Sequence, residues 1–522
     1  MPSYLTPGVY VEEIPAQSKP IEGVATAVAA FVGLAPGGPV NTPVQVSNWA
    51  QFTRVFGDVD NPDNGPFMEG AFLAHSVYGY FHNGGGLCWV VRVGSEDGGP
   101  AAVAALPPAG AAAADGVEAL RAIAQRGVTG PVTVELSEEP PPEKGDGDAK
   151  KDGGPTYRIV ITAGSEREEF DGLTLKKGRT NLATKVNAAS KLIKLEETGA
   201  ALPEAQRVPA TGTYELAAPA IAADELSADD FEGDVGRRRG MGALAAVDEI
   251  TMVCMPDVMT LRNGDDAMVR DLQGKMIAHC ENAKDRMAIL DAPPDLAASE
   301  VLDWRMDTAG YDSKFAAMYY PWLEVMDPIT KRPILVPPSG HMAGVWARTD
   351  GTRGVHKAPA NEVVLGANGL GYQVTHEEQG NLNRNGVNCI RAFRGRGIRV
   401  WGARTMSSDP EWRYLNVRRL FNFISESIIE GTQWAVFEPN DERLWIALRV
   451  STSNFLTRVW RDGALFGATP SEAFFVRCDA ETNPPDLVEA GQVTIQVGIA
   501  PVKPAEFVVF QISQFQPGAD AA

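Results

Sequence analysis

The chain has 522 residues, of which 44% are hydrophobic, and it carries a formal net charge of −20. This length suits several domains, and this hydrophobic content is enough to build sizeable cores. The negative charge disfavours proteins that wrap nucleic acid or bind anionic membrane surfaces, because both classes need positive patches.

The cysteines argue against a disulfide framework and against a zinc site. There are five, they are widely scattered, and none forms a CxxC pair: Cys88, Cys254, Cys280, Cys389 and Cys478. We expect reduced thiols in a protein made in the cytoplasm. The first residues lack the pattern of a signal peptide, and the longest apolar run, 24–35, is too short to span a bilayer. We therefore expect neither membrane insertion nor a bound metal.

A short strand-like stretch stands apart near the start of the chain. Prolines at 7 and 15 enclose it, and a polar spacer separates it from the next apolar run. A lone strand pays backbone entropy without a partner of its own, so it either covers the edge of its own domain or pairs with another subunit. The residues that we expect to form this strand are Val9, Tyr10, Val11, Glu12 and Ile14.

The next hundred residues alternate between strand and helix patterns. We expect buried strands within 24–35, at 44–46 and at 87–93, and helices within 47–58 and 67–85. From about 100 to 236 the chain becomes rich in Ala, Pro and acidic residues, which indicates a small domain inserted into a larger one. We expect strands at 131–136 and 156–164, a flexible acidic loop near 138–155, and a helix from Asn181 to Glu197.

Apolar patterns typical of buried strands and helices return after residue 240 and continue to the end of the chain. A strand, a helix over 268–285 and a second strand at 286–293 form a βαβ pattern, which predicts a parallel sheet. An apolar stripe that includes Leu420, Ile424 and Ile428 predicts one helix, which Gly431 is expected to end. A second stripe, from Leu444 to Val459, predicts another helix that closes at Asp462-Gly463.

Strand patterns occupy the last thirty residues. Alternation predicts that Val493, Ile495, Val497 and Ile499 point inward. Two prolines then separate a final strand from the rest of the chain, as at the N-terminus. The residues that we expect to carry it are Phe507, Val508, Val509, Phe510 and Ile512.

Motifs of catalysis and cofactor binding are missing from the sequence. It contains no Walker loop, no HExxH and no GxSxG elbow. Ser339-Gly340-His341 comes nearest to a hydrolase constellation, and we expect it to be a loop that follows the strand "PILVPP". The arginine-rich stretch 391–404 is expected to pair with carboxylates of the same or a neighbouring molecule. We therefore expect that the protein is not an enzyme and has no cofactor. Two other function classes stay open as alternatives: an α/β hydrolase and a non-contractile, self-assembling lattice protein.

Several spaced motifs resemble the tail sheath proteins of contractile phages and related injection systems. They are "YLTPGVYVEEI", "VPPSGHMAGVWARTDGTRGVHKAPAN", "GIRVWGARTM" and a C-terminal series from "RRLFNFISESI" to "APVKPAEFVVFQISQF". The resemblance implies a subunit that polymerises helically around an inner tube and contracts to drive that tube through a cell envelope. It also implies an α/β (α+β) multidomain fold, with a subtilisin-like middle domain that lacks a catalytic triad. In this family the terminal arms of neighbouring subunits complete one subunit's sheet.

The resemblance and the texture of the chain together give a domain division. It comprises an N-terminal strand-exchange arm (1–20), the N-terminal part of the sheath core (21–99), an inserted, mainly β surface domain (100–236), a subtilisin-like sheath domain (237–405), a C-terminal sheath domain (406–500) and a C-terminal arm and tail (501–522). The implied partners are further copies of the chain, an inner tube protein, and baseplate and tail terminator proteins. Nucleic acid is not among them. The mature location implied is a virion tail or an extracellular injection particle.

Overall fold

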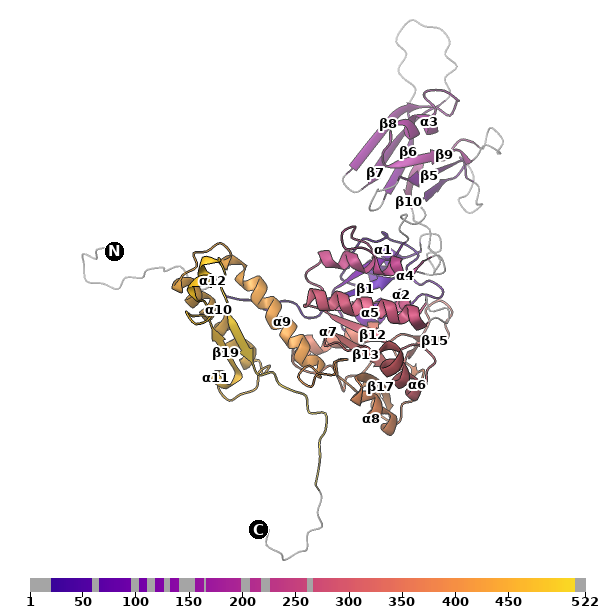
Figure 1. Cartoon of the computed structure of the whole chain (residues 1–522). Helices are drawn as coiled ribbons and strands as arrows, with labels where there is room; N and C mark the ends of the chain where they lie inside the picture. Colours follow the sequence, from indigo (N-terminus) through magenta and orange to yellow (C-terminus); the bar gives the residue numbers. More distant parts are fainter. Residues whose placement is uncertain are drawn as a thin grey trace, which may run out of the picture.

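The computed structural model describes residues 20–58, 65–94, 103–109, 118–125, 132–139, 155–163, 166–198, 207–216, 226–260 and 266–511. Figure 1 shows a central body in which helices cover a sheet, a mainly β body made by the inserted segment, and a smaller unit formed by the C-terminal helices and strands. Each of the three has its own cluster of buried hydrophobic residues.

The central body is built on an eight-stranded sheet in the order β18-β17-β13-β12-β11-β1-β3-β2. The six inner strands run parallel, while β2 and β18 pair antiparallel at the two edges. The bounds are β1 Ala29–Gly33, β2 Val44–Val46, β3 Cys88–Arg92, β11 Met252–Cys254, β12 Met287–Asp291, β13 Ala316–Tyr320, β17 Val387–Phe393 and β18 Gly397–Val400. The parallel sheet expected from the βαβ pattern is confirmed by the β11–β12 pairing, in which Met252 lies opposite Met287.

The chain leaves β1 in one direction along the sheet and later returns to its other side. β3 lies beside β1 on one side, and β11, β12, β13 and β17 follow on the other. Because crossovers between parallel strands are right-handed, the helices that connect β1 to β3 and β11 to β12 lie on opposite faces. The point where the direction reverses is between β1 and β11. In open α/β sheets, ligands bind in a crevice at the carboxyl ends of the strands on either side of such a reversal point.

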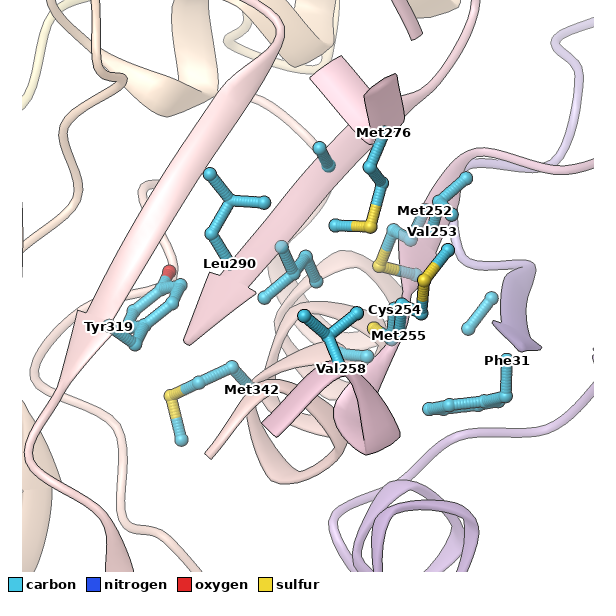
Figure 2. Packing of buried hydrophobic residues seen from close by; sticks show 14 of the residues in the cluster. Phe31, Met252, Val253, Cys254, Met255, Val258, Met276, Leu290, Tyr319 and Met342 are labelled. Carbon is cyan, nitrogen blue, oxygen red and sulfur yellow. The ribbon is translucent and has the colours of Figure 1, made fainter. Parts of the chain in front are cut away.

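Helices cover both faces of this sheet. Their bounds are α1 Trp49–Phe56, α2 Leu73–His82, α4 Ala228–Glu232, η6 Gly240–Ala246, η7 Pro256–Met259, α5 Asp266–Ala283, α6 Ala298–Asp303, η8 Trp304–Ala309, α7 Ser339–Arg353 and α8 His376–Arg384. α2 packs against α7, and α7 packs against β11 and β12. Figure 2 shows part of the core around the sheet, in which Met252, Met276, Met342, Leu290 and Phe31 are buried. A small three-stranded sheet of β14 Leu323–Met326, β15 Pro333–Val336 and β16 Gly369–Leu370 completes the body.

The inserted segment forms two antiparallel sheets, in the orders β10-β6-β7-β8 and β4-β5-β9. Inward residues of β6 and β7 alternate with outward ones, as expected for strands with one buried face. The bounds are β4 Val103–Leu106, β5 Leu120–Ala124, β6 Val132–Glu139, β7 Thr156–Ala163, β8 Glu166–Leu173, α3 Leu182–Ala189, β9 Ile193–Glu196 and β10 Gly212–Leu216. The centre of the expected acidic loop, 140–154, lies outside the described residues.

Two expectations for this segment need correction. The helix predicted from Asn181 to Glu197 ends at Ala189, because the Ser190 hydroxyl accepts the N–H groups of Leu192 and Ile193 and turns the chain into β9. The expected end of the segment at 236 also fails, since Phe231 of α4 is fully buried in the core of the central body. We therefore propose that the inserted domain ends before Leu226.

Residues on the two sides of the inserted segment are held close together. The Asn41 side chain bridges them: its Nδ2 donates to the Gly94 carbonyl at 3.0 Å, and its Oδ1 accepts the Gly240 N–H at 3.1 Å. Gly94, before the segment, and Gly240, which follows α4, thus meet at one place on the central body.

The C-terminal unit packs two long helices and a two-stranded sheet around a small core. The bounds are α9 Leu415–Thr432, η9 Gln433–Ala435, α10 Glu442–Arg461, α11 Pro470–Ala473, β19 Phe474–Arg477, α12 Pro485–Glu489 and β20 Gln496–Ile499. Both expected helices are confirmed, and Leu420, Ile424 and Phe455 lie in the core between them.

Two details of this unit differ from expectation. Gly431 does not end α9 but lies in its last turn, where an added Cβ would come within 2.7 Å of the Ile21 side chain, so close approach explains the glycine. Val497 was expected to point inward and is 37% exposed, because it pairs only with Val476 in a two-stranded ribbon that no further described strand covers.

Candidate assembly interface

The described chain begins against the C-terminal unit rather than against the central body. Ile21 is fully buried in the core formed by α9 and α10, and its carbonyl accepts a hydrogen bond from Arg458 of α10. The Val24 N–H donates to the Ser427 hydroxyl of α9 at 3.1 Å. The first described residues therefore pack on the C-terminal unit, although they are far from that unit in sequence.

A buried ion pair joins this N-terminal segment, α9 and the central body. The Arg419 guanidinium of α9 donates to both oxygens of Asp350 in α7, at 2.9 and 2.5 Å, and to the Thr26 carbonyl at 3.0 Å. It also lies 4.7 Å from the centre of the Trp346 ring. The two charged side chains are 4% and 3% exposed. Such a pair fixes three segments in one arrangement, because a buried charge without its partner is strongly destabilising.

The sheet of the C-terminal unit is unfinished. Among the described residues, β19 and β20 pair only with each other, so each strand has one free edge. An isolated two-stranded ribbon is marginally stable in water, and free edges invite additional strands. Both outer edges of this sheet are therefore open to further strand pairing.

The C-terminal arm continues from β20 and exposes a run of apolar side chains. Phe507, Val508, Val509 and Phe510 are 76, 71, 79 and 83% exposed, and they belong to no helix or strand of the single chain. The structure thus places four of the predicted site residues on an unpartnered segment. The fifth, Ile512, and the N-terminal set of Val9, Tyr10, Val11, Glu12 and Ile14 lie outside the described residues.

Fewer arginines of the stretch 391–404 form ion pairs with carboxylates than expected. Arg404 pairs with Glu506 of the arm, whereas Arg391 bonds the Gln379 side chain and Arg399 bonds the Asn361 carbonyl. In this stretch the ion pair of Arg404 is the one recorded within the described part of the chain. The prediction of carboxylate partners therefore holds for Arg404.

The residues that come nearest to a hydrolase active site in the sequence lie at the start of a helix. Ser339 and His341 were expected in a loop, but they form the first turn of α7 and are buried. The helix begins there because the Asp291 carboxylate accepts the Ser339 N–H at 2.7 Å, which satisfies an N–H that a helix cannot pair internally. Side chains two positions apart on a helix do not face each other, so this serine and histidine are not arranged as nucleophile and base.

The crevice at the reversal point of the sheet is occupied by the protein itself. Asp257, which follows β11, is fully buried there and accepts the N–H groups of Leu34, at 2.6 Å, and of Phe72. Gly33 leaves the room for this carboxylate, since an added Cβ would lie 2.3 Å from its Oδ2. Burial raises the pKa of Asp257 to about 7, and the backbone N–H groups oppose that rise. An enzyme would bind its substrate in this position.

Other site types find no support in the described part of the chain. There, no group of three or more His, Cys, Asp or Glu side chains could hold a metal ion. Within the same residues, no helix combines the length and the apolar character that crossing a membrane requires.

Some residues that shape the interface were not identified from the sequence. Ile21, Arg419 and Glu506 each act through partners distant in the chain, which no local pattern reveals. The adjacent arginines 418 and 419 on the apolar face of α9 were the available signal, because charged residues on a buried face need partners.

Together the fold and these surfaces define an α/β protein with a two-stranded sheet at its C-terminal unit and an exposed apolar segment at residues 507–510. Sequence comparison agrees: residues 235–406 match the phage tail sheath protein central domain, and residues 407–515 match the phage tail sheath C-terminal domain. These two matches cover more than half of the chain, which belongs to the phage tail sheath family.

One relative extends the similarity over nearly the whole chain, and another covers about half of it. The tail sheath protein of Burkholderia phage BcepMu is 25% identical over 97% of this chain and 95% of its own length. The tail sheath protein of Escherichia phage P2 is 23% identical over 52% of this chain and 66% of its own.

Solved structures of contractile systems share the fold. A chain of the anti-feeding prophage baseplate is 26% identical with a TM-score of 0.57, and a chain of the contracted helical sheath of the same particle is 25% identical with a TM-score of 0.58. Each comparison covers 98% of this chain and 100% of the other.

Proposed function

We propose that this protein is the repeating subunit of a contractile sheath, which polymerises helically around an inner tube and shortens to drive the tube through a target cell envelope. Membership of the sheath family and the likeness to a contracted helical sheath support helical polymerisation and contraction. The mature protein is then part of a phage tail or an extracellular injection particle, assembled in the cytoplasm of the producing cell. Its partners are further copies, the inner tube protein, the baseplate and the tail terminator.

One observation supports the assembly mechanism. Among its described residues, the same chain has a two-stranded sheet with free edges and an exposed apolar arm that has no partner strand. We infer that residues 507–512 of one subunit add to the free edge of the β19–β20 sheet of a second copy, and that residues 9–14 do the same from another copy. Strand addition satisfies backbone hydrogen bonds that neither the arm nor the edge satisfies alone. It also buries apolar side chains, at about 1.5–3 kcal/mol each.

This type of contact also accounts for the geometry of the polymer. An arm and a sheet edge are different surfaces, so the contact is heterologous, and heterologous contacts that do not close a ring generate a helix. The buried Arg419–Asp350 pair supports a subunit in which the C-terminal unit and the central body move together. Rotation of subunits during contraction would then be absorbed by the arms.

The central body is proposed to be a subtilisin-like scaffold that has lost catalysis. The reversal of direction beside β1 and the position of Asp291 at the N-terminus of α7 support this topology. The crevice filled by Asp257 and the buried start of α7 favour a structural role over a hydrolase. The inserted domain is proposed to lie on the outside of the sheath, because it has its own core and the flanking residues Gly94 and Gly240 meet at one place on the central body.

Cysteine cross-linking between copies tests strand addition. All five native cysteines are buried, so an engineered pair reacts selectively. Copies with Val508→Cys are mixed with copies carrying Arg477→Cys in β19 or Gln496→Cys in β20, and polymerisation is induced under oxidising conditions. We expect disulfide-linked dimers with at least one of these partners and none with Lys194→Cys on the inserted domain. Polymers that form without a cross-link to β19 or β20 would contradict the mechanism.

A further inference from the structure

The C-terminal arm is attached to its own subunit over its first residues. The Phe466 N–H donates to the Ala500 carbonyl at 2.7 Å, and the Val502 N–H donates to the Ala464 carbonyl at 3.2 Å. The Asn416 side chain of α9 donates to the Val502 carbonyl at 3.1 Å. The arm therefore follows a defined path along the subunit after β20 ends.

Its last attachment is an ion pair with the central body. Arg404 donates to Glu506 with two nitrogens, Nε to Oε1 at 2.9 Å and Nη2 to Oε2. The side chains are only 10% and 16% exposed, so solvent screens this pair less than an ordinary surface pair. A two-pronged contact between arginine and carboxylate also fixes direction, which a single hydrogen bond does not.

Arg404 is a rigid base for this contact. Its backbone N–H donates to the Asn388 Oδ1 at 2.7 Å, and its carbonyl accepts from the Asn388 Nδ2 at 2.8 Å. Asn388 itself is fully buried in β17. The guanidinium makes a further bond to the Asn383 carbonyl at 3.2 Å. The arginine is thus held in place by the central sheet whether or not the arm is bound.

Attachment stops immediately after this pair. The described residues beyond it, 507–511, have no recorded hydrogen bond or ion pair with their own chain, and the four apolar side chains among them are at least 71% exposed. Glu506 is therefore the boundary between the part of the arm held by its own subunit and the part free for another.

We propose that Arg404 and Glu506 form an exit anchor, which fixes the point and the direction in which residues 507–512 leave the subunit and so selects the second copy that they reach. This inference rests on the proposed exchange of the C-terminal arm. Arg404 and Glu506 are positioning residues in it. The strand-forming residues 507–512 make the contact, and the anchor presents them. Without it the arm can still pair, but it samples many directions, and correct contacts become rarer.

Charge reversal tests the anchor. The variants are Arg404→Glu, Glu506→Arg, the double reversal of both, and Glu506→Gln. The last is a mild change on the arm that leaves the central sheet untouched. Arg158→Glu, which breaks the surface pair with Glu169 on the inserted domain, is the control with the same change in net charge as Arg404→Glu. The critical concentration for polymerisation is measured by sedimentation, and folding is checked by thermal unfolding of the monomer.

We expect each single reversal to raise the critical concentration about ten-fold or more, because a shielded pair becomes a pair of like charges. Glu506→Gln should raise it about three-fold or more. The double reversal should return it to within about three-fold of the native value, and Arg158→Glu should leave it unchanged. Native critical concentrations for folded Arg404→Glu and Glu506→Gln would overturn the proposal, and so would a folded double reversal that restores nothing.

A distance measurement on the monomer separates positioning from general stability. Spin labels on Val508→Cys and on Glu377→Cys, an exposed position in the first turn of α8, report where the arm leaves. We expect a narrow distance distribution in the native background and a broad one with Glu506→Gln. Equal distributions would contradict the anchor.

Deletion of residues 507–522 distinguishes failure of this inference from failure of the proposed function. If the deletion leaves polymerisation intact, arm exchange itself is wrong. If the deletion abolishes polymerisation but the anchor variants polymerise as the native protein does, the exchange stands and only the anchor is wrong.

Discussion

The Arg419–Asp350 pair offers a direct test of how the C-terminal unit is held on the central body. Arg419→Met keeps much of the volume but removes three hydrogen bonds, two to Asp350 and one to the Thr26 carbonyl. The Asp350 carboxylate, 3% exposed, is then left buried without a cation. Breaking a buried pair in this way costs about 3–5 kcal/mol.

The matched variants separate the pair from the loss of an arginine side chain. Arg419→Met with Asp350→Leu removes both charges, and apolar replacement of a whole buried pair is often close to neutral, so most of that cost should be recovered. Arg443→Met, an exposed arginine on α10, should change stability by no more than about 0.5 kcal/mol.

Hydrogen exchange with urea unfolding of the monomer locates the effect. In Arg419→Met we expect faster exchange in residues 20–28 and in α9, because these segments share the lost contacts. The inserted domain, which has a separate core, should be unchanged. A cost below about 1 kcal/mol, or exchange that rises equally in all three parts, would refute the reasoning.

Three further predictions address other parts of the molecule. Deletion of residues 1–14 should leave a folded monomer that no longer polymerises, as judged by circular dichroism and sedimentation; normal tubes would contradict the arm's role. Replacement of residues 95–225 by a Gly/Ser linker should leave polymerisation intact, because the inserted domain has its own core and the flanking Gly94 and Gly240 are both held by Asn41 on the central body; amorphous aggregates alone would place the inserted domain within the lattice. Burial raises the pKa of Asp291 from 3.8 to about 7, so the stability that its neutral form provides is complete below pH 3.8 and is lost as the pH rises through about 7. Asp291→Asn keeps an oxygen for the Ser339 N–H and should raise the free energy of unfolding by about 1–4 kcal/mol at about pH 8 but much less at about pH 5. The pH dependence of stability that remains in this variant is due to Asp257. An equal change at both pH values would refute this assignment.

The sequence revealed those elements whose periodicity follows directly from burial. The alternation in β6 and β7 and the stripe on α9 were predictable, because each has one buried face. The helix predicted across Ser190 was not correct, since a side-chain hydroxyl ends it and the residues after it alternate as a strand. A count of helix-compatible residues cannot detect such a local hydrogen bond.

The candidate interface divided in the same way. The separation of the arm residues 507–510 from the core could be predicted, because these apolar residues follow two prolines at the end of the chain, and the structure leaves all four exposed. The anchor of that arm could not, since Arg404 and Glu506 are 102 positions apart and meet only through the fold. The role of Gly431 was misjudged for a related reason: Ile21, its neighbour in space, belongs to the other end of the chain.

Cryo-electron microscopy of the polymer formed with the proposed inner tube protein tests the central claim most directly. The account predicts a helical sheath of stacked copies in two lengths, with residues 507–512 of one copy paired to the β19–β20 sheet of another and Arg404 bonded to Glu506 within each copy. A helical sheath in which every arm folds back onto its own subunit, or a protein that forms no helical polymer around the tube, would contradict it.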